Sequence, residues 1–519
     1  MDWVLTHSIT TLLLLAIPAL FVVGALQSRG QRGRCFLPVS TPIAALVLVA
    51  VLTLAYIAGA QPLALLQLQP LTLVMLALIS LLALVIMRFS QRYMDGEANA
   101  WRYAQWLQLT LAAVMLVIIS NHLALMWLGW VLISLALHNL LMFYPERPRA
   151  ALGAHKKFLL ARLAESCLLV AFVLLYQVHG SAYLSDIVAA YGSAPALTIS
   201  EQVAMLLIAT TALIKCAQLP VHGWLMQVVE APTPVSALLH AGVINLGGFL
   251  LISFAPLLLL AQPAQWLLLL VAGISTVLAA LIMATRISVK VRLAWSTSAQ
   301  MGLMLVECAL GLFELALLHL VAHSLYKAYA FLNAGSAVQQ YLLQQWLPQR
   351  GAHCANWTLA AAISLPLVAL AAWWVAPQGP FSPWLLLGLA LTVLLARRDQ
   401  VSLGSWSVLA VVLLAAYSLL KMTSASLLPD YQIHVSLWND AWVALLVLSL
   451  FALRSWLSSS RSEAAQRFNL YLYAGFYLDE WFTRTTLRLW PARIPKRANA
   501  KRHVVKPSLT NANNATNAK

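Results

Sequence analysis

Lysine, histidine and glutamate residues occur within stretches of this chain that are otherwise almost wholly apolar. Lys215 lies one turn before Pro220, and a proline interrupts a helix because it lacks a backbone N–H donor. His319, His323 and Lys327 are spaced i, i+4 and i+8, which places all three on one face of a helix. Histidine exchanges protons near neutral pH, and burial brings lysine closer to that range. The spacing therefore predicts a series of proton-exchanging groups.

Other ionisable residues extend this candidate ion path. A charge at the centre of a bilayer costs about 2.5–3.5 kcal/mol on insertion scales, so chains keep one mainly when it is paired or functional. The residues that meet this condition are Glu165, His240, Glu307 and His138. For His138 a packing role is an equally good interpretation, and Glu314 is interpreted as a loop residue between two helices. Pro232 and Pro234, shortly before His240, are predicted to break the chain of helices as Pro220 does.

The elements that must position these residues are membrane-spanning helices. The 519 residues are 62% hydrophobic and only 9% charged, with a mean hydropathy of +0.82, so a soluble protein's charged surface is lacking. Apolar stretches of sufficient length to cross a hydrocarbon core of about 30 Å recur from end to end, and the first is interpreted as a spanning helix and not a cleaved signal. The sequence predicts an all-α polytopic membrane protein of about fifteen transmembrane helices, some of them broken, near 8–27, 37–58, 70–88, 104–119, 122–143, 158–178, 201–229, 235–257, 264–284, 293–311, 313–339, 357–375, 383–396, 402–420 and 437–453.

The charge distribution predicts the orientation of the chain. A net charge of +16 would suggest nucleic-acid binding in a soluble protein, but cytoplasmic loops of membrane proteins also accumulate Lys and Arg, so no nucleic acid is expected. Alternate loops are basic, whereas 59–69 and 179–200 are nearly free of Lys and Arg. This pattern predicts an outside N-terminus and a cytoplasmic C-terminus in a bacterial inner membrane. The basic residues are Arg29, Arg32, Arg34, Arg88, Arg92, Arg102, Arg147, Arg149, Lys156, Lys157, Arg286, Lys290, Arg292, Arg350, Arg397 and Arg398.

Composition divides the chain into five predicted regions. Residues 1–103 form N-terminal transmembrane helices, 104–340 an ion-conducting core, and 341–460 further transmembrane helices. Residues 461–495 mix aromatic and charged residues at helical spacing, which predicts an interfacial segment that docks on lipid or a partner. Residues 496–519 are polar and predicted to be disordered. The five cysteines are scattered and form no CxxC pair; they are Cys35, Cys167, Cys216, Cys308 and Cys354. No nucleotide-binding loop is found either. The sequence therefore predicts neither a cofactor in this chain nor enzyme chemistry.

Three long motifs resemble the antiporter-like subunits of respiratory complex I and Mrp antiporters. They are KCAQLPVHGWLMQVVEAPTPVSALLHAG (215–242), RISVKVRLAWSTSAQMG (286–302) and HLVAHSLYKAYAFLNAGS (319–336). The resemblance covers roughly residues 70–340 and is similar to the branch that contains NuoL. It implies an antiporter-like bundle in which Lys215, His240 and the face formed by His319, His323 and Lys327 belong to the proton path.

The chain also departs from this family. The family's key glutamate follows Leu-Gly-Trp on the fifth helix, but here Trp130 is followed by Val131. Glu165, where relatives carry an acid on the sixth helix, is the candidate substitute. The family's second lysine on another broken helix has no clear match, and the long lateral helix of NuoL is not found.

Two further segments narrow the resemblance. SLALHNLL (134–141) and FYPERPRAALGAHKKF (143–158) look most like the membrane subunits of DAB inorganic-carbon accumulation complexes. The resemblance implies a DabA-like cytoplasmic zinc partner, related to β-carbonic anhydrases, that hydrates CO2 while this chain conducts protons or another cation inward. The alternatives are a proton-translocating subunit of a complex I-like or hydrogenase-like redox complex, and a membrane anchor whose charges no longer conduct. The sequence leaves open whether the ion is H+ or Na+.

Overall fold

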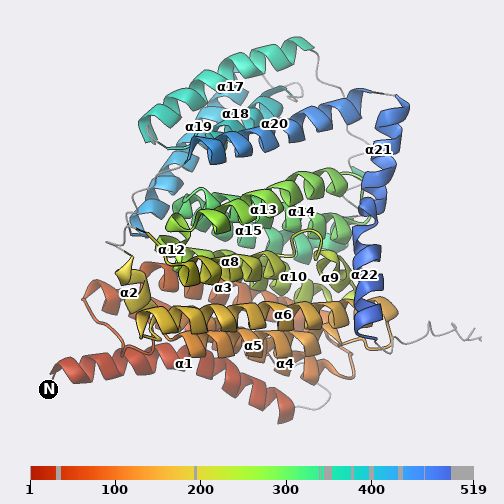
Figure 1. Ribbon diagram of the computed structural model, residues 1–519. Coiled ribbons are helices and arrows are strands. Elements are labelled where there is room, and N and C mark those ends of the chain that lie inside the picture. Colours follow the sequence, from red (N-terminus) through yellow and green to blue (C-terminus); the bar gives the residue numbers. More distant parts are fainter. Residues whose placement is uncertain are drawn as a thin grey trace, which may run out of the picture.

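The computed structural model describes residues 2–30, 37–191, 196–337, 354–375, 379–396, 403–429, 436–460 and 462–491, together with 339 and 342–343. All regular elements in these ranges are helices (Figure 1). Arg32, Arg34, Cys35, Arg350, Arg397, Arg398 and the predicted tail 496–519 lie outside the described residues.

Each of the fifteen predicted segments corresponds to a helix or to a helix pair joined through a break. The bounds are α1 (Asp2–Gly30), α2 (Ser40–Ile57), α3 (Pro70–Tyr93), α4 (Ala100–Ile119), α5 (Leu123–Leu141), α6 (Pro148–His179), α8 (Ile199–Lys215) with α9 (Gly223–Gln227), α10 (Thr233–Ala241) with α11 (Leu246–Ser253), α13 (Gln262–Met283), α14 (Val289–Ala309), α15 (Phe313–Leu332), α17 (Cys354–Val375), α18 (Ser382–Ala396), α19 (Leu403–Ser426) and α20 (Leu437–Ser459).

Among the described residues, 12 of these segments are long and apolar enough to cross a membrane by length and composition. The other three are α8 with 17 residues, α18 with 15 residues, and the more polar α14. Two short helices were not expected, α7 (Leu184–Ala190) and α12 (Ala255–Leu260). The predicted all-α architecture is confirmed for the described residues.

The helices pack in layers around a continuous apolar core (Figure 1). Helices α1, α4, α5 and α6 form one side, α13, α14 and α15 lie between the layer of α8 and α10 and the layer of α17 to α20, and α17 to α20 cover the far side. The α10–α11 segment is the most enclosed, with 94% of its apolar window buried. Outer helices instead expose large apolar side chains such as Leu12, Ile57 and Trp374. Such surfaces suit lipid, which does not penalise exposed apolar groups.

The first broken helix ends at Lys215. Ala217 has a φ of 50°, in the left-handed region that disfavours residues other than glycine, and Pro220 lies between α8 and α9. The freed backbone groups find buried partners: Ser298 Oγ donates to the Ala217 carbonyl at 2.9 Å, and Leu219 N donates to Ser275 Oγ at 3.1 Å. Irregular backbone at membrane depth is tolerated when it is satisfied in this way.

The prolines before His240 act differently from the prediction. Pro232 precedes α10 and Pro234 lies in its first turn, so they begin a helix and do not interrupt one. A proline is tolerated there because the first N–H groups of a helix have no intrahelical partner. The interruption of this segment comes later, at Gly242 and the 3-10 turn η2 (Val243–Asn245).

The described part of the predicted interfacial segment, 462–491, crosses one end of the bundle as a strap (Figure 1). It consists of α21 (Glu463–Ala474), η4 (Gly475–Tyr477) and α22 (Leu478–Leu489). Asp479 pairs with the fully buried Lys156 of α6 at 2.6 Å, and Lys156 also donates to Thr483 at 2.8 Å. Arg286 donates to the Leu472 carbonyl at 3.3 Å, and burial lowers the pKa of this guanidinium. The strap is therefore anchored to its own chain by charged contacts.

Candidate functional site

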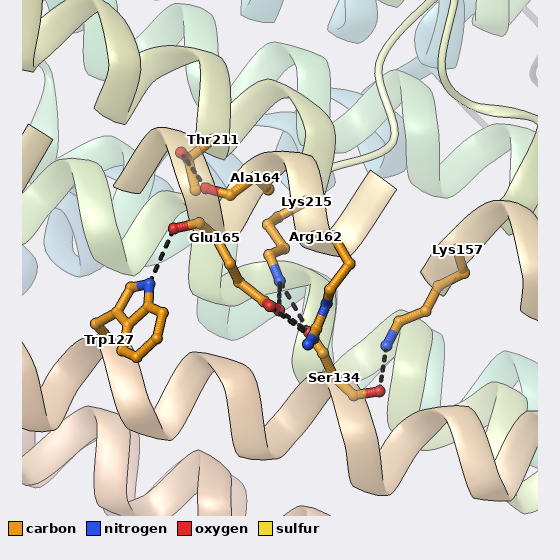
Figure 2. Close-up of polar contacts among 8 residues, drawn as sticks. All are labelled: Trp127, Ser134, Lys157, Arg162, Ala164, Glu165, Thr211 and Lys215. Atoms are coloured by element: carbon orange, nitrogen blue, oxygen red, sulfur yellow. Dashed lines mark hydrogen bonds and ion pairs between the residues drawn. The ribbon is translucent and has the colours of Figure 1, made fainter. Parts of the chain in front are cut away.

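Lys215 lies in a buried cluster of charged and polar groups, the Lys215 cluster, which comprises Ser134, Lys157, Arg162, Glu165 and Lys215. Lys215 Nζ lies 3.3 Å from Glu165 Oε1 and 3.1 Å from Ser134 Oγ (Figure 2). Ser134 donates to Glu165 Oε1, and Arg162 Nη2 lies 2.6 Å from Glu165 Oε2. The Glu165 carboxylate therefore pairs with a lysine and an arginine and accepts a hydrogen bond from a serine hydroxyl.

Three helices supply the side chains of this cluster. Glu165 and Arg162 come from α6, Ser134 from α5, and Lys215 from the end of α8. Trp127 Nε1 donates to the Glu165 carbonyl at 2.9 Å, which ties α5 to α6 beside the site (Figure 2). Ser134 lies one turn after Val131, the position at which the resembled family has glutamate, so a hydroxyl and an acid from α6 together contact the lysine.

Lys157 completes the cluster from the α6 side. Its side chain is buried, and Nζ donates to the Ser134 carbonyl at 2.9 Å (Figure 2). A cavity of about 30 Å³ is lined by Ser134, Lys157, Lys215 and Trp224. That volume is sufficient for one water molecule with polar partners.

A second cluster, the His319 cluster, lies between α14 and α15 and comprises Glu307, His319, His323 and Lys327. His319 Nδ1 lies 3.1 Å from both carboxylate oxygens of Glu307. Lys327 is fully buried and donates to Ser296 Oγ at 2.7 Å and to the Leu293 carbonyl at 3.3 Å. His323 is buried, and neither ring nitrogen has a hydrogen-bond partner among the described residues.

His240 is connected to the His319 cluster through α14. Its Nδ1 lies 3.1 Å from Thr297 Oγ1, and that hydroxyl donates to the Leu293 carbonyl at 3.0 Å. Because the hydroxyl proton is engaged, Thr297 accepts from His240, so Nδ1 carries the hydrogen, and Nε2 is buried without a hydrogen-bond partner among the described residues. The same Leu293 carbonyl accepts from Lys327. His240, through Thr297, and Lys327 directly are therefore both linked to the Leu293 carbonyl.

The connection between Lys215 and His240 is indirect. The cavity beside Lys215 is walled on the α10 side by the apolar residues Leu239, Val243 and Ile244. The polar contacts run instead through the break after Lys215, where Gln218 Nε2 donates to the Ser298 carbonyl at 3.1 Å. Ser298 adjoins Thr297, the partner of His240, so α14 lies between the two clusters.

A third buried pair was missed by the sequence analysis. Glu314, expected in a loop, lies in the first turn of α15, 3.1 Å from Lys421 Nζ of α19, with 14% and 12% of the two side chains exposed. Tyr417, one turn before Lys421, interacts electrostatically with both Glu307 and Glu314. The available signal was Lys421 itself, a lone cation in the apolar stretch 403–426.

His138 is placed beside the Lys215 cluster without joining its hydrogen bonds. Its ring centroid lies 5.4 Å from that of Phe158, and Nδ1 is buried without a partner among the described residues. Both interpretations of this histidine, packing and proton exchange, are compatible with that position. Within the described residues, no three His, Cys, Asp or Glu side chains gather as possible metal ligands.

Comparison with known proteins places the chain in a membrane-protein family. Residues 120–373 match the family described as NADH:quinone oxidoreductase/Mrp antiporter, TM, and residues 62–104 match the N-terminus of complex I chain 5. The chain is similar to the Mrp complex from Dietzia sp. DQ12-45-1b, with a TM-score of 0.53 and 20% identity over 93% of this chain. It spans 55% of that Mrp chain, and this likeness shows the fold alone.

Curated relatives narrow the family further. The chain is 50% identical over 440 residues to the probable inorganic carbon transporter subunit DabB of Hydrogenovibrio crunogenus, which covers 83% of this chain and 85% of the relative. It is 35% identical over 544 residues to DabB2 of Halothiobacillus neapolitanus, covering 96% and 98% of the two chains. The predicted resemblance is confirmed. This chain belongs to the DabB family of inorganic carbon transporter subunits, within the antiporter-like membrane proteins.

Proposed function

We propose that this chain is the proton- or cation-conducting membrane subunit of an energy-coupled inorganic carbon pump. The observation that carries the proposal is a set of three buried acid–base pairs in one membrane core, Lys215 with Glu165, His319 with Glu307, and Lys421 with Glu314. Buried charges are costly in a membrane, so their number argues for a function beyond anchoring. The family name of the relatives supplies the link to inorganic carbon.

The chemistry proposed for the path is stepwise proton exchange. An ion arriving beside one pair weakens the attraction between lysine and carboxylate, which changes the proton affinity of the lysine. His240, His323 and Lys327, buried between the pairs, provide groups that bind and release protons in turn. Each elementary charge that crosses with the membrane potential releases about 2.3 kcal/mol per 100 mV, which is available for coupled work.

The proposed orientation has an outside N-terminus and a cytoplasmic C-terminus. Contacts gather the basic loops at the end crossed by the strap: Lys290 donates to Thr233 at 2.7 Å, and Thr233 lies 3.3 Å from the Tyr93 hydroxyl. At the opposite end Leu63 N donates to Thr11 near the N-terminus at 2.9 Å. Basic loops favour the cytoplasm, so the strap end would be cytoplasmic in a bacterial inner membrane.

The proposed partner is a DabA-like cytoplasmic zinc subunit that hydrates CO2 to bicarbonate. In this arrangement the zinc and the hydration chemistry belong to the partner, and this chain acts as a transporter subunit without a cofactor of its own. The predicted docking segment is the strap, which leaves Tyr471, Trp481 and Trp490 exposed beside its anchoring contacts.

Purification of the chain with its native partner tests this function against the redox alternative. The proposal expects a copurifying subunit with stoichiometric zinc and with neither flavin nor iron–sulfur absorbance. A partner that carries flavin or iron–sulfur clusters would instead identify a complex I-like or hydrogenase-like assembly and overturn the carbon-pump proposal.

A further inference from the structure

Lys157, which the sequence analysis counted among the basic loop residues, is a buried residue of α6 to which the proposed path gives no role. Only 7% of the residue is exposed, and the hydrogen bond that Nζ makes is to a backbone carbonyl, that of Ser134 at 2.9 Å. Lys156, its neighbour in sequence, has a carboxylate partner in Asp479 at 2.6 Å. The contrast shows that this part of α6 can pair a lysine with an acid, yet Lys157 is placed without one.

The charges around Lys157 do not balance. The groups that face it are Lys215 from α8, Arg162 and Glu165 from α6, and His138 from α5. Glu165 is the one carboxylate among them in the described residues, and it is already engaged by Arg162 and Lys215. Arg162 is partly exposed, with 36% of its side chain accessible, so the enclosed cations are Lys157 and Lys215, and a carboxylate already shared with Arg162 cannot neutralise both of them. The arrangement therefore favours a state in which either Lys157 or Lys215 is a neutral amine.

Lys157 and Lys215 also contact the same serine and line the same cavity. Ser134 accepts from Lys157 at its carbonyl and from Lys215 at its hydroxyl, at 2.9 and 3.1 Å. Both amines line the same cavity of about 30 Å³. A water molecule in a cavity of this kind can accept a hydrogen from one amine and donate to the other.

We propose that Lys157 is the group with which Lys215 exchanges its proton on the strap side of the molecule. An N–H bond of the Lys215 ammonium breaks and an N–H bond forms on the neutral Lys157 amine, through one water that gives up and regains a proton. The site keeps its total charge, and the positive charge moves from α8 to α6. This inference rests on the proposed function and deepens it, because it names the group with which Lys215 exchanges its proton.

The position of Lys157 along α6 gives the exchange a direction. Lys157 lies eight residues before Glu165, about 12 Å nearer the start of the helix at 1.5 Å per residue. That start is at the strap end, where His155 Nε2 lies 3.0 Å from the Trp490 carbonyl. Transfer to Lys157 thus moves the proton toward the end at which the basic loops gather.

Three substitutions of Lys157 separate proton exchange from a purely structural role. Lys157→Met removes the amine, Lys157→Arg keeps a permanent charge that cannot be released, and Lys157→His keeps a group that exchanges protons. Proton flux is measured with a pH-sensitive dye in vesicles that contain the purified complex, under an imposed pH gradient with CO2 present. We expect Met and Arg each to lower flux by about tenfold or more, and His to retain more flux than Arg.

Two reference variants make the outcome decisive. Lys290→Met is the matched control, since Lys290 lies outside both clusters, and it should leave flux unchanged. Lys215→Met should abolish flux, and normal flux in that variant would reject the proposed function itself. If Lys215→Met abolishes flux while Lys157→Arg equals the wild type, or Lys157→Met is unaffected, only the role of Lys157 is overturned. If the Lys157→Met variant fails to assemble, the comparison of Lys157→His with Lys157→Arg decides. Higher flux in the His variant supports proton exchange, whereas higher flux in the Arg variant indicates a purely structural role and overturns the proposal.

Discussion

At Glu165 a single carboxylate contacts a lysine from one helix, an arginine from its own helix and a serine from a third. Arg162 lies on Oε2 at 2.6 Å, while Lys215 and Ser134 share Oε1. A carboxylate shared in this manner holds its cations in a defined geometry, and any change in its charge reaches all of them. Glu165 is therefore the residue that links the other charged and polar groups of the Lys215 cluster.

Replacement of Glu165 by Gln should lower inorganic-carbon accumulation by about tenfold or more, because the enclosed Lys215 and the partly exposed Arg162 lose the carboxylate that they share. Uptake of labelled bicarbonate by cells that lack carbonic anhydrase measures the effect, with the amount of membrane-inserted protein determined in parallel. Glu146→Gln, an exposed acid in the loop after α5, is the control and should transport normally. Normal uptake by the Glu165→Gln variant would contradict the assigned role.

The pair formed by Glu314 and Lys421 gives a second residue-scale prediction. If both groups belong to one path, Glu314→Gln and Lys421→Met should each reduce accumulation, and the double variant should be no worse than the more severe single one. The exposed pair of Glu463 with Arg467, with side chains 84% and 75% exposed, is the control and should tolerate Ala at both positions. Independent, multiplicative losses at Glu314 and Lys421 would argue against a common path.

Local spacing could predict some of these residues and not others. His319, His323 and Lys327 share a face because they lie on one helix, so periodicity was sufficient to group them. The contact between Glu314 and Lys421 joins residues more than one hundred positions apart, and nothing in the local pattern of either helix indicates it. Ser134 was likewise not predicted as a site residue, because a serine on an apolar helix gives no signal until its neighbours are placed.

At the scale of elements, the broken helices and the strap are the features that depart from a simple bundle. Pro220 made the first break predictable, since proline removes a backbone donor. The second break falls at Gly242 with φ −114° and ψ −72°, where glycine was hidden within an apolar run, while Pro232 and Pro234 start a helix. The helical spacing of 461–495 indicated a surface segment, but its anchoring through Lys156 depends on tertiary contacts.

The strap fits against the broken helix at a glycine. A Cβ atom added to Gly223 would lie 1.5 Å from Asp479 Oδ1, so Gly223→Ala must displace this carboxylate from Lys156. We expect a loss of about 2–3 kcal/mol in stability, since Lys156 is fully buried and Asp479 is partly exposed. Thermal unfolding of the detergent-solubilised protein measures it. Gly335→Ala, which meets nothing within 4 Å, should leave the melting temperature unchanged, and equal temperatures for both variants would refute the anchoring role.

At the scale of the whole molecule, the two ends of the bundle differ in charge and in construction. One end has the strap and the basic loops, where Arg147 donates to the Glu230 carbonyl at 3.3 Å. The other has short bridges between loops, Leu66 with Ser120 and His122 with Tyr183. The length and apolar character of the helices made the bundle predictable, because lipid requires uninterrupted apolar spans. Which helices become central was not predictable, since apolar character does not follow burial: α4 is less apolar than α2 yet more buried.

This asymmetry predicts the sidedness of two loops. A cysteine placed at Gln61 should react with an impermeant thiol reagent in intact spheroplasts, whereas one at the exposed Arg149 should react only after the membrane is opened. The unsubstituted chain sets the labelling background. Reaction of the Arg149→Cys variant in sealed spheroplasts would reverse the proposed orientation and place the strap outside.

The central claim is that ions pass through the membrane along the buried charges that begin at Lys215. The most direct measurement is inorganic-carbon accumulation, in cells that lack carbonic anhydrase, by the wild-type chain and by Lys215→Ala expressed with the same partner at the same level. The account predicts that Lys215→Ala reduces accumulation to the level of cells without the complex. Wild-type accumulation by that variant, with normal membrane insertion, would contradict the account.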